Sequence, residues 1–378
     1  MSALLLLSAA RLAQVTLGPA GNTCPPSHPA KLTSVYGCRS GMHLLGYEAG
    51  DLHGSEDEAD WPSGCYHCQG VSDCSDGAFH NMNAVGSANG DAQPYCALEN
   101  YIQSGRVLFV GDSDIDYWPY DSMPISDSYN VGWGGYTCAE VLAEVDDLLS
   151  FFSPSAVILV CGENNLANGQ SASDAFLDFE AIVSKIRESG ARTIYVGTKP
   201  EPGTADLHTE YRNYDDQIKA HATSLAAAAT STPPLIVIDS YHGFEDAGNP
   251  TSLYDSDELH LSAAGYALWA TWLTQAYLAL ASTTGESAAC YVWRSGACTQ
   301  PASAGAVDDE DGAAAADDGA AEGDGDTLGD SAAGGDAPCF PSSALVQLSD
   351  GTPTRVDAQG SHKHIHPLPY ACLNECTS

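Results

Sequence analysis

Between residues 101 and 285, short apolar runs alternate with longer segments in which apolar residues recur every three or four positions. The runs are typical of buried strands in a parallel sheet, and the periodic segments are typical of helices that cover it. Strands are predicted at 106–110, 127–131, 155–161, 193–198 and 235–239, and helices at about 138–151, 173–189, 207–228 and 262–282. Such alternation predicts right-handed βαβ units, so the loops after the strands should meet at one edge of the sheet.

Polar motifs follow several of these strands, where open α/β sheets bind their ligands. They are Gly111-Asp112-Ser113, the glycine loop 131–138, Gly162-Glu163-Asn164, and Asp257 with His260 just before the last helix. A serine hydroxyl is a weak nucleophile that needs a neighbouring base such as histidine, and an aspartate can fix the tautomer of that histidine. Backbone N–H groups and a side-chain amide can bind a developing oxyanion. The chemistry that these residue types allow is acyl transfer.

In order and spacing, the four motifs resemble those of the SGNH hydrolases, also called GDSL-like lipases and esterases, across residues 105–282. The resemblance implies a three-layer α/β/α sandwich with a flavodoxin-like, parallel five-stranded sheet. It implies that Ser113 is the nucleophile, His260 the general base and Asp257 the residue that orients His260. It also implies an oxyanion hole formed by Ser113, Gly135 and Asn164, with Gly134 as the fallback for Gly135. No metal and no organic cofactor belong to this chemistry.

Each motif has a simpler interpretation when it is taken alone. Ser113 could cap the next helix, Asn164 could form a turn, and His260 could lie at a helix start or on the surface. The occurrence of all four motifs in order favours the enzyme. The chain departs from the family at Asp114, where leucine is usual, and at Asn165, where aspartate is usual. We expect neither departure to remove the site.

The segment 21–100 is rich in glycine, proline and cysteine, and its six cysteines are Cys24, Cys38, Cys65, Cys68, Cys74 and Cys96. An even set of cysteines in a short segment predicts a disulfide module and an oxidising compartment. The Cys65-x-x-Cys68 spacing also fits a zinc site, although no second matching pair follows. Zinc therefore remains the weaker alternative.

Two cysteines lie within residues 101–285, and two more follow shortly after this segment. Cys290 and Cys298 are expected to close a small disulfide loop within 286–300. Cys161 ends a predicted buried strand, so we expect it to be a free core thiol, and Cys138 has no evident partner.

Charge and the amino terminus bear on where the protein works. The formal net charge of -37 argues against nucleic acid and disfavours anionic membrane surfaces. No apolar run reaches the ~18 residues of a membrane span. Residues 1–20 contain a short apolar core followed by small residues, as in a secretory signal peptide. Together with the cysteines, these features predict a secreted or extracellular protein, whose partner proteins the sequence does not identify.

The carboxyl-terminal segments have a different composition. Residues 301–338 are mostly alanine, glycine and aspartate, with eleven acidic residues and no basic one, which predicts a disordered linker. The stretch from Cys339 resembles the opening of a Hint module, the hedgehog/intein autoprocessing fold, in which a leading cysteine attacks the preceding carbonyl. No Thr-x-x-His follows, so 339–378 is predicted to be a truncated fragment without self-cleavage.

The sequence therefore predicts a secreted serine esterase that hydrolyses carboxylic esters through an acyl-enzyme on Ser113. A small-molecule or polysaccharide ester with a short acyl or acetyl group is the expected substrate, since no long apolar lid segment is visible. The alternative is a non-catalytic extracellular protein, in which the cysteine-rich module binds glycan or cell wall and the α/β body is a scaffold.

Overall fold

The structure is a computed structural model. It describes residues 14–70, 74–103, 105–125, 127–228, 235–282, 290–299, 354–356 and 362–364. The chain divides into two compact units, 1–301 and 302–378, which are described separately.

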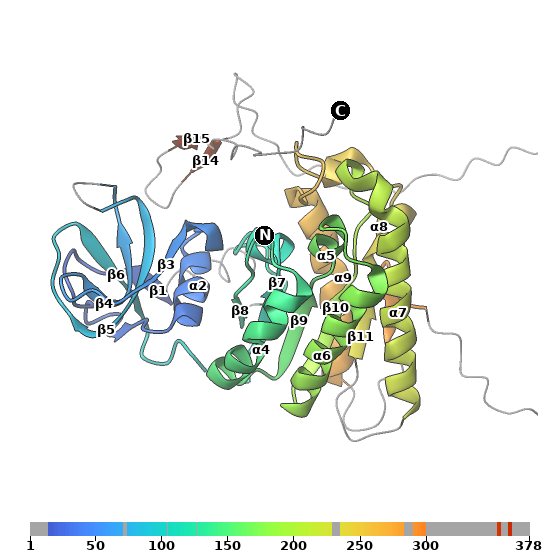
Figure 1. Ribbon diagram of the computed structural model, residues 1–378, viewed down its shortest axis with the longest axis horizontal. Coiled ribbons are helices and arrows are strands. Elements are labelled where there is room, and N and C mark those ends of the chain that lie inside the picture. The colour runs from blue at the N-terminus through green and yellow to red at the C-terminus, as the bar shows by residue number, and fades with distance from the viewer. Residues whose placement is uncertain are drawn as a thin grey trace, which may run out of the picture. The chain divides into compact units, whose positions relative to one another are not determined.

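A seven-stranded sheet forms the centre of the α/β body (Figure 1). Five parallel strands lie in the spatial order β8 (Ser128–Asn130), β7 (Val107–Gly111), β9 (Ala156–Val160), β10 (Arg192–Val196) and β11 (Leu235–Ile238). This is the flavodoxin-like order, so the predicted fold class is confirmed. Two further strands extend the sheet beyond β11, namely the parallel β12 (Val292–Arg294) and the antiparallel β13 (Ala297–Cys298).

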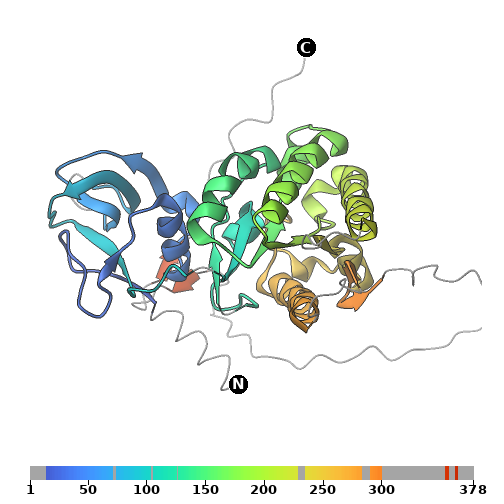
Figure 2. The same cartoon turned by 90° about the horizontal axis from the view of Figure 1, so that it is seen from below.

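Helices cover both faces of this sheet (Figure 2). One face carries α4 (Cys138–Phe152), α6 (Ala172–Glu188) and α7 (His208–Ala227), and the other carries α9 (Ala263–Ser282). Because side chains alternate along a strand, neighbouring residues of β7 pack on opposite faces of the sheet. Leu108 packs in the core on the side of α4, α6 and α7, whereas Phe109 packs in the core on the side of α9, against Trp118.

Short helices begin at the carboxyl ends of the strands, and the hydrophobic pattern did not predict them. They are α3 (Ser113–Asp116), α5 (Glu163–Ala167) and α8 (Ser240–Asp246), with the 3-10 turns η2 (Pro202–Leu207) and η3 (Thr251–Leu253) nearby in the chain. Each is too short to show a helical apolar period, so only the loop residues themselves could have signalled them.

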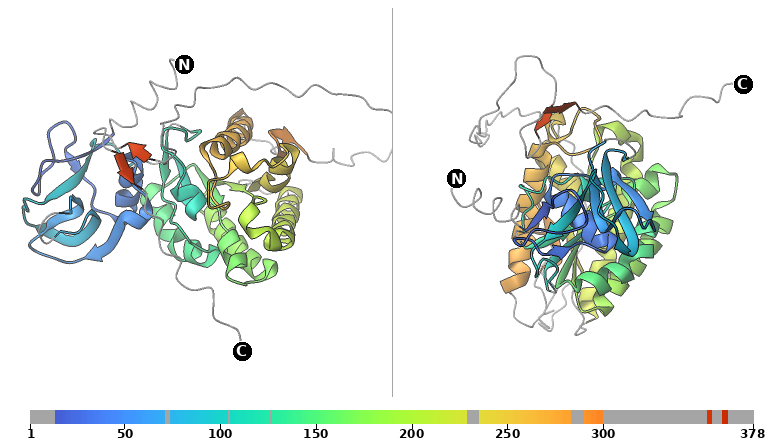
Figure 3. Two further views of the ribbon diagram at one scale, coloured as in Figure 1. Left: turned by 90° about the horizontal axis from the view of Figure 1, so that it is seen from above. Right: turned by 90° about the vertical axis from the view of Figure 1, so that its left-hand side faces the viewer.

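The cysteine-rich segment folds as a second sheet beside one helix, and its strands face the viewer in the right-hand view of Figure 3. Its elements are β1 (Val15–Leu17), β2 (Ala30–Lys31), α2 (Val35–Leu44), η1 (Ala49–Asp51), β3 (Leu52–Glu56), β4 (Pro62–Cys68), β5 (Gly77–Gly86) and β6 (Ala92–Ala97). The strands pair in the order β1–β6–β4–β5–β3, with β2 also on β6. We call residues 14–100 the disulfide module.

Three disulfides cross-link this module, and they join Cys24 to Cys96, Cys38 to Cys65, and Cys68 to Cys74. The predicted disulfide framework is thus present. The pairing consumes both sulfurs of the Cys65-x-x-Cys68 motif, so the zinc alternative for that motif is wrong.

The predicted signal segment 1–20 overlaps the folded module. Val15 is 1% exposed and pairs with Ala97 of β6. Residues 1–13 lie outside the described residues. The boundary expected at residue 20 therefore falls after a strand that belongs to the module.

The expectation that Cys161 is a free thiol is wrong, because Cys161 forms a disulfide with Cys138, for which the sequence showed no evident partner. Cys138 begins α4 and Cys161 follows β9. In a crossover the helix runs antiparallel to the strand that follows it, so the start of α4 and the end of β9 meet at the same sheet edge. The predicted Cys290–Cys298 disulfide is also present.

In the second unit the structure describes one antiparallel pair, β14 (Thr354–Val356) with β15 (His362–His364). The predicted linker 301–338 and the predicted Hint fragment 339–378, apart from this pair, lie outside the described residues. Among the helices of the described residues, none is long and apolar enough to cross a membrane.

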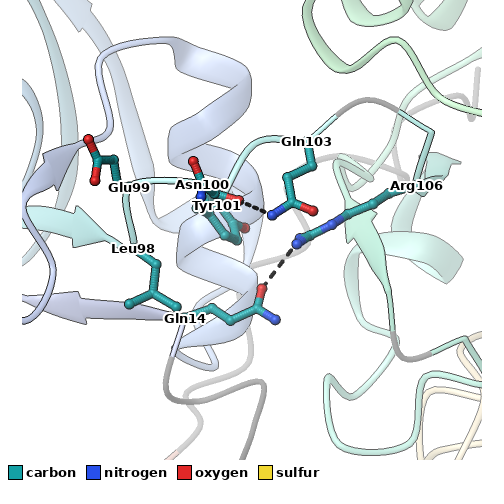
Figure 4. A pocket seen from close by; sticks show the side chains of 7 residues that line it. All are labelled: Gln14, Leu98, Glu99, Asn100, Tyr101, Gln103 and Arg106. Carbon is teal, nitrogen blue, oxygen red and sulfur yellow. Dashed lines mark hydrogen bonds between the residues drawn. The ribbon is translucent and has the colours of Figure 1, made fainter.

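The connection between the module and the α/β body lines a shallow pocket (Figure 4). Gln103 Nε2 donates a hydrogen bond to the Asn100 carbonyl over 2.6 Å, and Arg106 Nη1 donates one to Gln14 Oε1 over 3.4 Å. None of the residues predicted to be catalytic lines this pocket, so it is separate from the site described next.

Candidate active site

Ser113 is the first residue of α3, directly after β7. A Cβ at Gly111 would lie 2.2 Å from the Val160 carbonyl oxygen, so only glycine lets the end of β7 pass this close to β9. Asp112 Oδ1 accepts a hydrogen bond from the Asp114 N–H over 3.1 Å and so caps the helix. Capping therefore falls to Asp112, and the Ser113 hydroxyl, which is partly exposed, makes no hydrogen bond with the described residues.

Asp257 and His260 form a close pair on the loop before α9. Asp257 Oδ2 lies 2.6 Å from His260 Nδ1, and Asp257 Oδ1 accepts the N–H groups of Leu259 and His260, each over 3.0 Å. Partial burial raises the pKa of Asp257, but the hydrogen bond from His260 and the two N–H groups outweigh it and hold the pKa below its ordinary value. The carboxylate is thus ionised at neutral pH and holds the proton of His260 on Nδ1, which leaves Nε2 as the basic nitrogen.

The His260 ring packs against Tyr117, with 4.7 Å between ring centroids. Tyr117 is the C-cap of α3, and its N–H donates to the Ser113 carbonyl over 2.9 Å. Burial, followed by the negative charges of Glu48 and Asp116, raises the pKa of Tyr117 to about 12, so its phenol stays neutral. This contact brings His260 to the helix that begins with Ser113.

The glycine loop lies beside Ser113, and its two candidate glycines differ in their hydrogen bonds. A Cβ built on Gly134 would lie 4.0 Å from the Ser113 Cβ, but the Gly134 N–H already donates to Asp116 Oδ2 over 3.0 Å. Gly135 has φ +82°, and its N–H has no partner in the described part of the chain. The geometry therefore favours Gly135 over the fallback Gly134 as a donor to a bound ligand.

Asn164 and Asn165 have different surroundings at the start of α5. Asn164 is partly exposed, and its Nδ2 donates to the Tyr136 carbonyl over 3.0 Å, which places the amide against the glycine loop. Asn165 is fully buried, and its Oδ1 accepts the Cys138 N–H over 2.8 Å at the start of α4. Asn165 thus has a structural role at the start of α4.

A second Asp-x-x-His pair, Asp239 and His242, was not singled out from the sequence. His242 Nδ1 lies 2.9 Å from Asp239 Oδ1, and the His242 ring contacts Tyr241. No described contact joins this pair to α3 or to the glycine loop. Of the two histidines, only His260 has a described contact with the end of the helix that begins with Ser113, through Tyr117.

A buried charge cluster beneath Ser113 was also missed. Lys199 is 1% exposed, and its Nζ donates to Asp114 Oδ2 and Glu163 Oε2, each over 2.7 Å, and to Glu201 Oε1. Burial lowers the pKa of Lys199, but the three carboxylates outweigh burial and raise the pKa well above its ordinary value. The ammonium therefore stays charged. The three carboxylates are close enough to share a metal ion, yet the Lys199 ammonium occupies their midst. The available signal was the lysine that follows the end of β10, in the segment Gly197-Thr198-Lys199-Pro200-Glu201.

Comparisons with known proteins find one matching family model and several similar solved structures. The family model of the GDSL-like lipase/acylhydrolase family matches residues 120–268. This range contains Gly135, Asn164, Asp257 and His260 and begins after Ser113. No curated protein sequence matches the chain.

Solved structures with a similar fold include a GDSL-like lipase from Bacteroides thetaiotaomicron, with 17% identity, 45% of this chain and 86% of that chain covered, and a TM-score of 0.38. A member of the lipolytic G-D-S-L family from Veillonella parvula has 18% identity and a TM-score of 0.39, and the match covers 48% of this chain and 98% of that chain. An acetylxylan esterase from Geobacillus stearothermophilus has 16% identity and a TM-score of 0.38, and the match covers 48% of this chain and 97% of that chain. Residues 120–268 are thus similar to the GDSL-like lipase/acylhydrolase family.

Proposed function

We propose that the protein is a secreted serine esterase with Ser113 as nucleophile, His260 as general base and Asp257 as the residue that orients His260. The observation that carries this proposal is the Asp257–His260 hydrogen bond of 2.6 Å together with the packing of His260 on Tyr117 of α3. Nε2 is left as the basic nitrogen of His260, whose ring packs against the end of the helix that begins with Ser113. The free Ser113 hydroxyl needs only such a base to become a nucleophile.

The reaction follows from these positions. Ser113 Oγ attacks the ester carbonyl carbon while its proton passes to His260 Nε2, and the oxyanion accepts hydrogen bonds from the N–H groups of Ser113 and Gly135. The second N–H of the Asn164 amide supplies the third donor, since only one is used on Tyr136. The alcohol leaves with the proton from His260. Water then attacks the acyl-enzyme and gives a proton to His260, and His260 passes this proton to Ser113 Oγ as the carboxylic acid is released.

A short acyl group, above all acetyl, is the preferred acyl half, since the sequence shows no long apolar lid segment. The alcohol half is a small molecule or a carbohydrate. Secretion is supported by the five disulfides of the described residues, which persist in oxidising compartments.

A fluorophosphonate probe tests the nucleophile directly. The folded protein should be labelled, and Ser113→Ala should abolish labelling while leaving the unfolding temperature close to that of the wild type. Hydrolysis of chromogenic esters from acetyl to palmitoyl should be fastest for the short chains. Absence of labelling, or equal labelling of Ser113→Ala, would favour the non-catalytic glycan-binding alternative, and hydrolysis restricted to long chains would contradict the acyl preference alone.

A further inference from the structure

We propose that the disulfide module is part of the active site, because Arg39 of α2 holds the glycine loop that carries Gly135 in its working position. Arg39 is a positioning residue in this proposal. The inference rests on the proposed function, in which Gly135 supplies an oxyanion donor.

Arg39 contacts the glycine loop at both of its ends. Its Nη2 donates to the Val131 carbonyl over 2.6 Å, where the loop begins. Its guanidinium carbon lies 4.7 Å from the Trp133 ring centroid and 5.6 Å from that of Tyr136. A planar guanidinium can stack on rings and donate within its plane at the same time, which an ammonium cannot do. The side chain thus fixes the two residues that flank Gly134 and Gly135.

A carboxylate of α4 completes this contact. Arg39 Nη1 lies 2.7 Å from Glu144 Oε2, and Glu144 Oε1 accepts the Tyr136 hydroxyl over 2.9 Å. Arg39 is 4% exposed, so its charge is paired within the protein and not by water. Removing the guanidinium leaves the loop without its ionic and stacking partner.

A second element of the module supports the same loop through Asp116. Asp116 Oδ1 accepts the Ala49 N–H of η1 over 2.8 Å, and Oδ2 accepts the Gly134 N–H over 3.0 Å. Asp116 ends α3, which begins with Ser113. The module is therefore tied to both sides of the reaction centre, the loop of Gly135 and the helix of Ser113.

Loop position matters because an oxyanion donor acts only over a narrow distance range. Donors stabilise the transition state when they lie about 2.7–3.1 Å from the developing oxyanion. A shift of ~1 Å can cost about 100-fold in rate. Loss of Arg39 should therefore lower kcat, while KM, which depends on ground-state contacts, should change little.

The test compares Arg39→Met with Arg106→Met in the full-length chain. Arg106 makes the same kinds of contact, 2.7 Å to Asp127 Oδ1 and 5.2 Å to the Tyr129 ring centroid, but at the opposite, amino-terminal end of β7. Arg39→Met should lower kcat and the rate of fluorophosphonate labelling by about 100-fold. Arg106→Met should leave kcat unchanged, although it also removes an ion pair and a ring contact.

Amide hydrogen exchange of residues 131–136 gives a readout that does not require activity. These amides include hydrogen-bonded ones, such as Val131 to Phe109 and Trp133 to Gly111, so exchange reports loop opening. Exchange here should be at least about ten-fold faster in Arg39→Met than in Arg106→Met. Faster exchange in a protein whose wild type is not labelled would uphold the positioning role and refute the proposed esterase function.

Equal exchange and equal kcat in the two variants would overturn the role of Arg39. If Arg39→Met does not fold, Arg39→Lys decides the matter, because lysine keeps the charge near Glu144 but loses the planar stacking. A folded Arg39→Lys with reduced kcat and unchanged KM would support the proposal. A folded Arg39→Lys with wild-type kcat and exchange would refute it.

Discussion

The orientation of one histidine is decided at the residue scale. Asp257 and Asp239 each hold a histidine three positions later, with Nδ1 at hydrogen-bonding distance from the carboxylate. The two pairs have the same local chemistry. Only the neighbours in space differ, since His260 packs on Tyr117 beside Ser113.

Replacing each aspartate by asparagine separates the two pairs. Asp257→Asn should lower kcat by about 10³- to 10⁴-fold, because an amide can hold the wrong histidine tautomer and cannot stabilise the imidazolium. Asp239→Asn should leave kcat within about two-fold of the wild type, since this pair does not reach the reaction centre. The measurement is steady-state hydrolysis of an acetyl ester, and a larger loss in Asp239→Asn would reverse the assignment.

At the scale of elements, Lys199 joins the ends of three neighbouring strands. Asp114 follows β7, Glu163 follows β9, and Glu201 follows β10 close to Lys199 itself. Their carboxylates converge on one buried ammonium. The cluster fixes the ends of the strands that support Ser113, and its cost in desolvation is offset only while the pairing is complete.

Lys199→Met should lower the free energy of unfolding at pH 7 by about 3–5 kcal/mol, because it leaves buried carboxylates without a counter-charge. Burial raises the pKa of Glu163, so the folded variant binds protons more readily than the unfolded chain. The deficit relative to the wild type should therefore shrink as the pH falls from 7 to 5.

Urea unfolding of Lys199→Met and of Lys185→Met at both pH values measures this effect. Lys185 pairs with Asp146 at the surface, so its loss should cost no more than about 1 kcal/mol at either pH. A deficit in Lys199→Met that does not change with pH would contradict carboxylate burial as its cause.

On the scale of the whole molecule, the module and the α/β body form one compact unit, 1–301. Met42 of the module packs in the same buried core cluster as Val141 of α4. His43 contacts the body as well, with Nε2 2.7 Å from the Trp118 carbonyl. The predicted boundary near residue 100 thus separates two sheets but crosses a shared core.

Two truncations test this organisation. A chain that ends at residue 301 should keep the unfolding temperature and kcat of the full chain, because the described core lies before that point. A chain that begins at residue 101 should aggregate or unfold at least about 10 °C lower, since it exposes the face that α2 covers. An active 101–301 fragment of full stability would show that the module is dispensable and would argue against its role at the active site.

Local pattern was enough to predict the central sheet and its long helices. Apolar strands and amphipathic helices have short periods, so residues such as those of β9 and α6 identify their own structure. The roles expected for Ser113, Gly135, Asn164, Asp257 and His260 came from the resemblance of their motifs to a known family, and the topology rule predicts that loops after parallel strands lie at one edge. The fold class was predicted correctly on that basis, and residues 120–268 match the model of the GDSL-like lipase/acylhydrolase family.

Tertiary structure alone decided contacts between residues far apart in sequence. The Cys138–Cys161 disulfide, the Lys199 cluster and the packing of His260 on Tyr117 all depend on which loops lie side by side, which no local sequence pattern encodes. The position of Arg39 on the glycine loop is the extreme case, since 92 residues separate it from Val131. Sequence by itself determined which elements form and what chemistry they carry, and packing decided which side chains act together, because contact is a property of the folded chain as a whole.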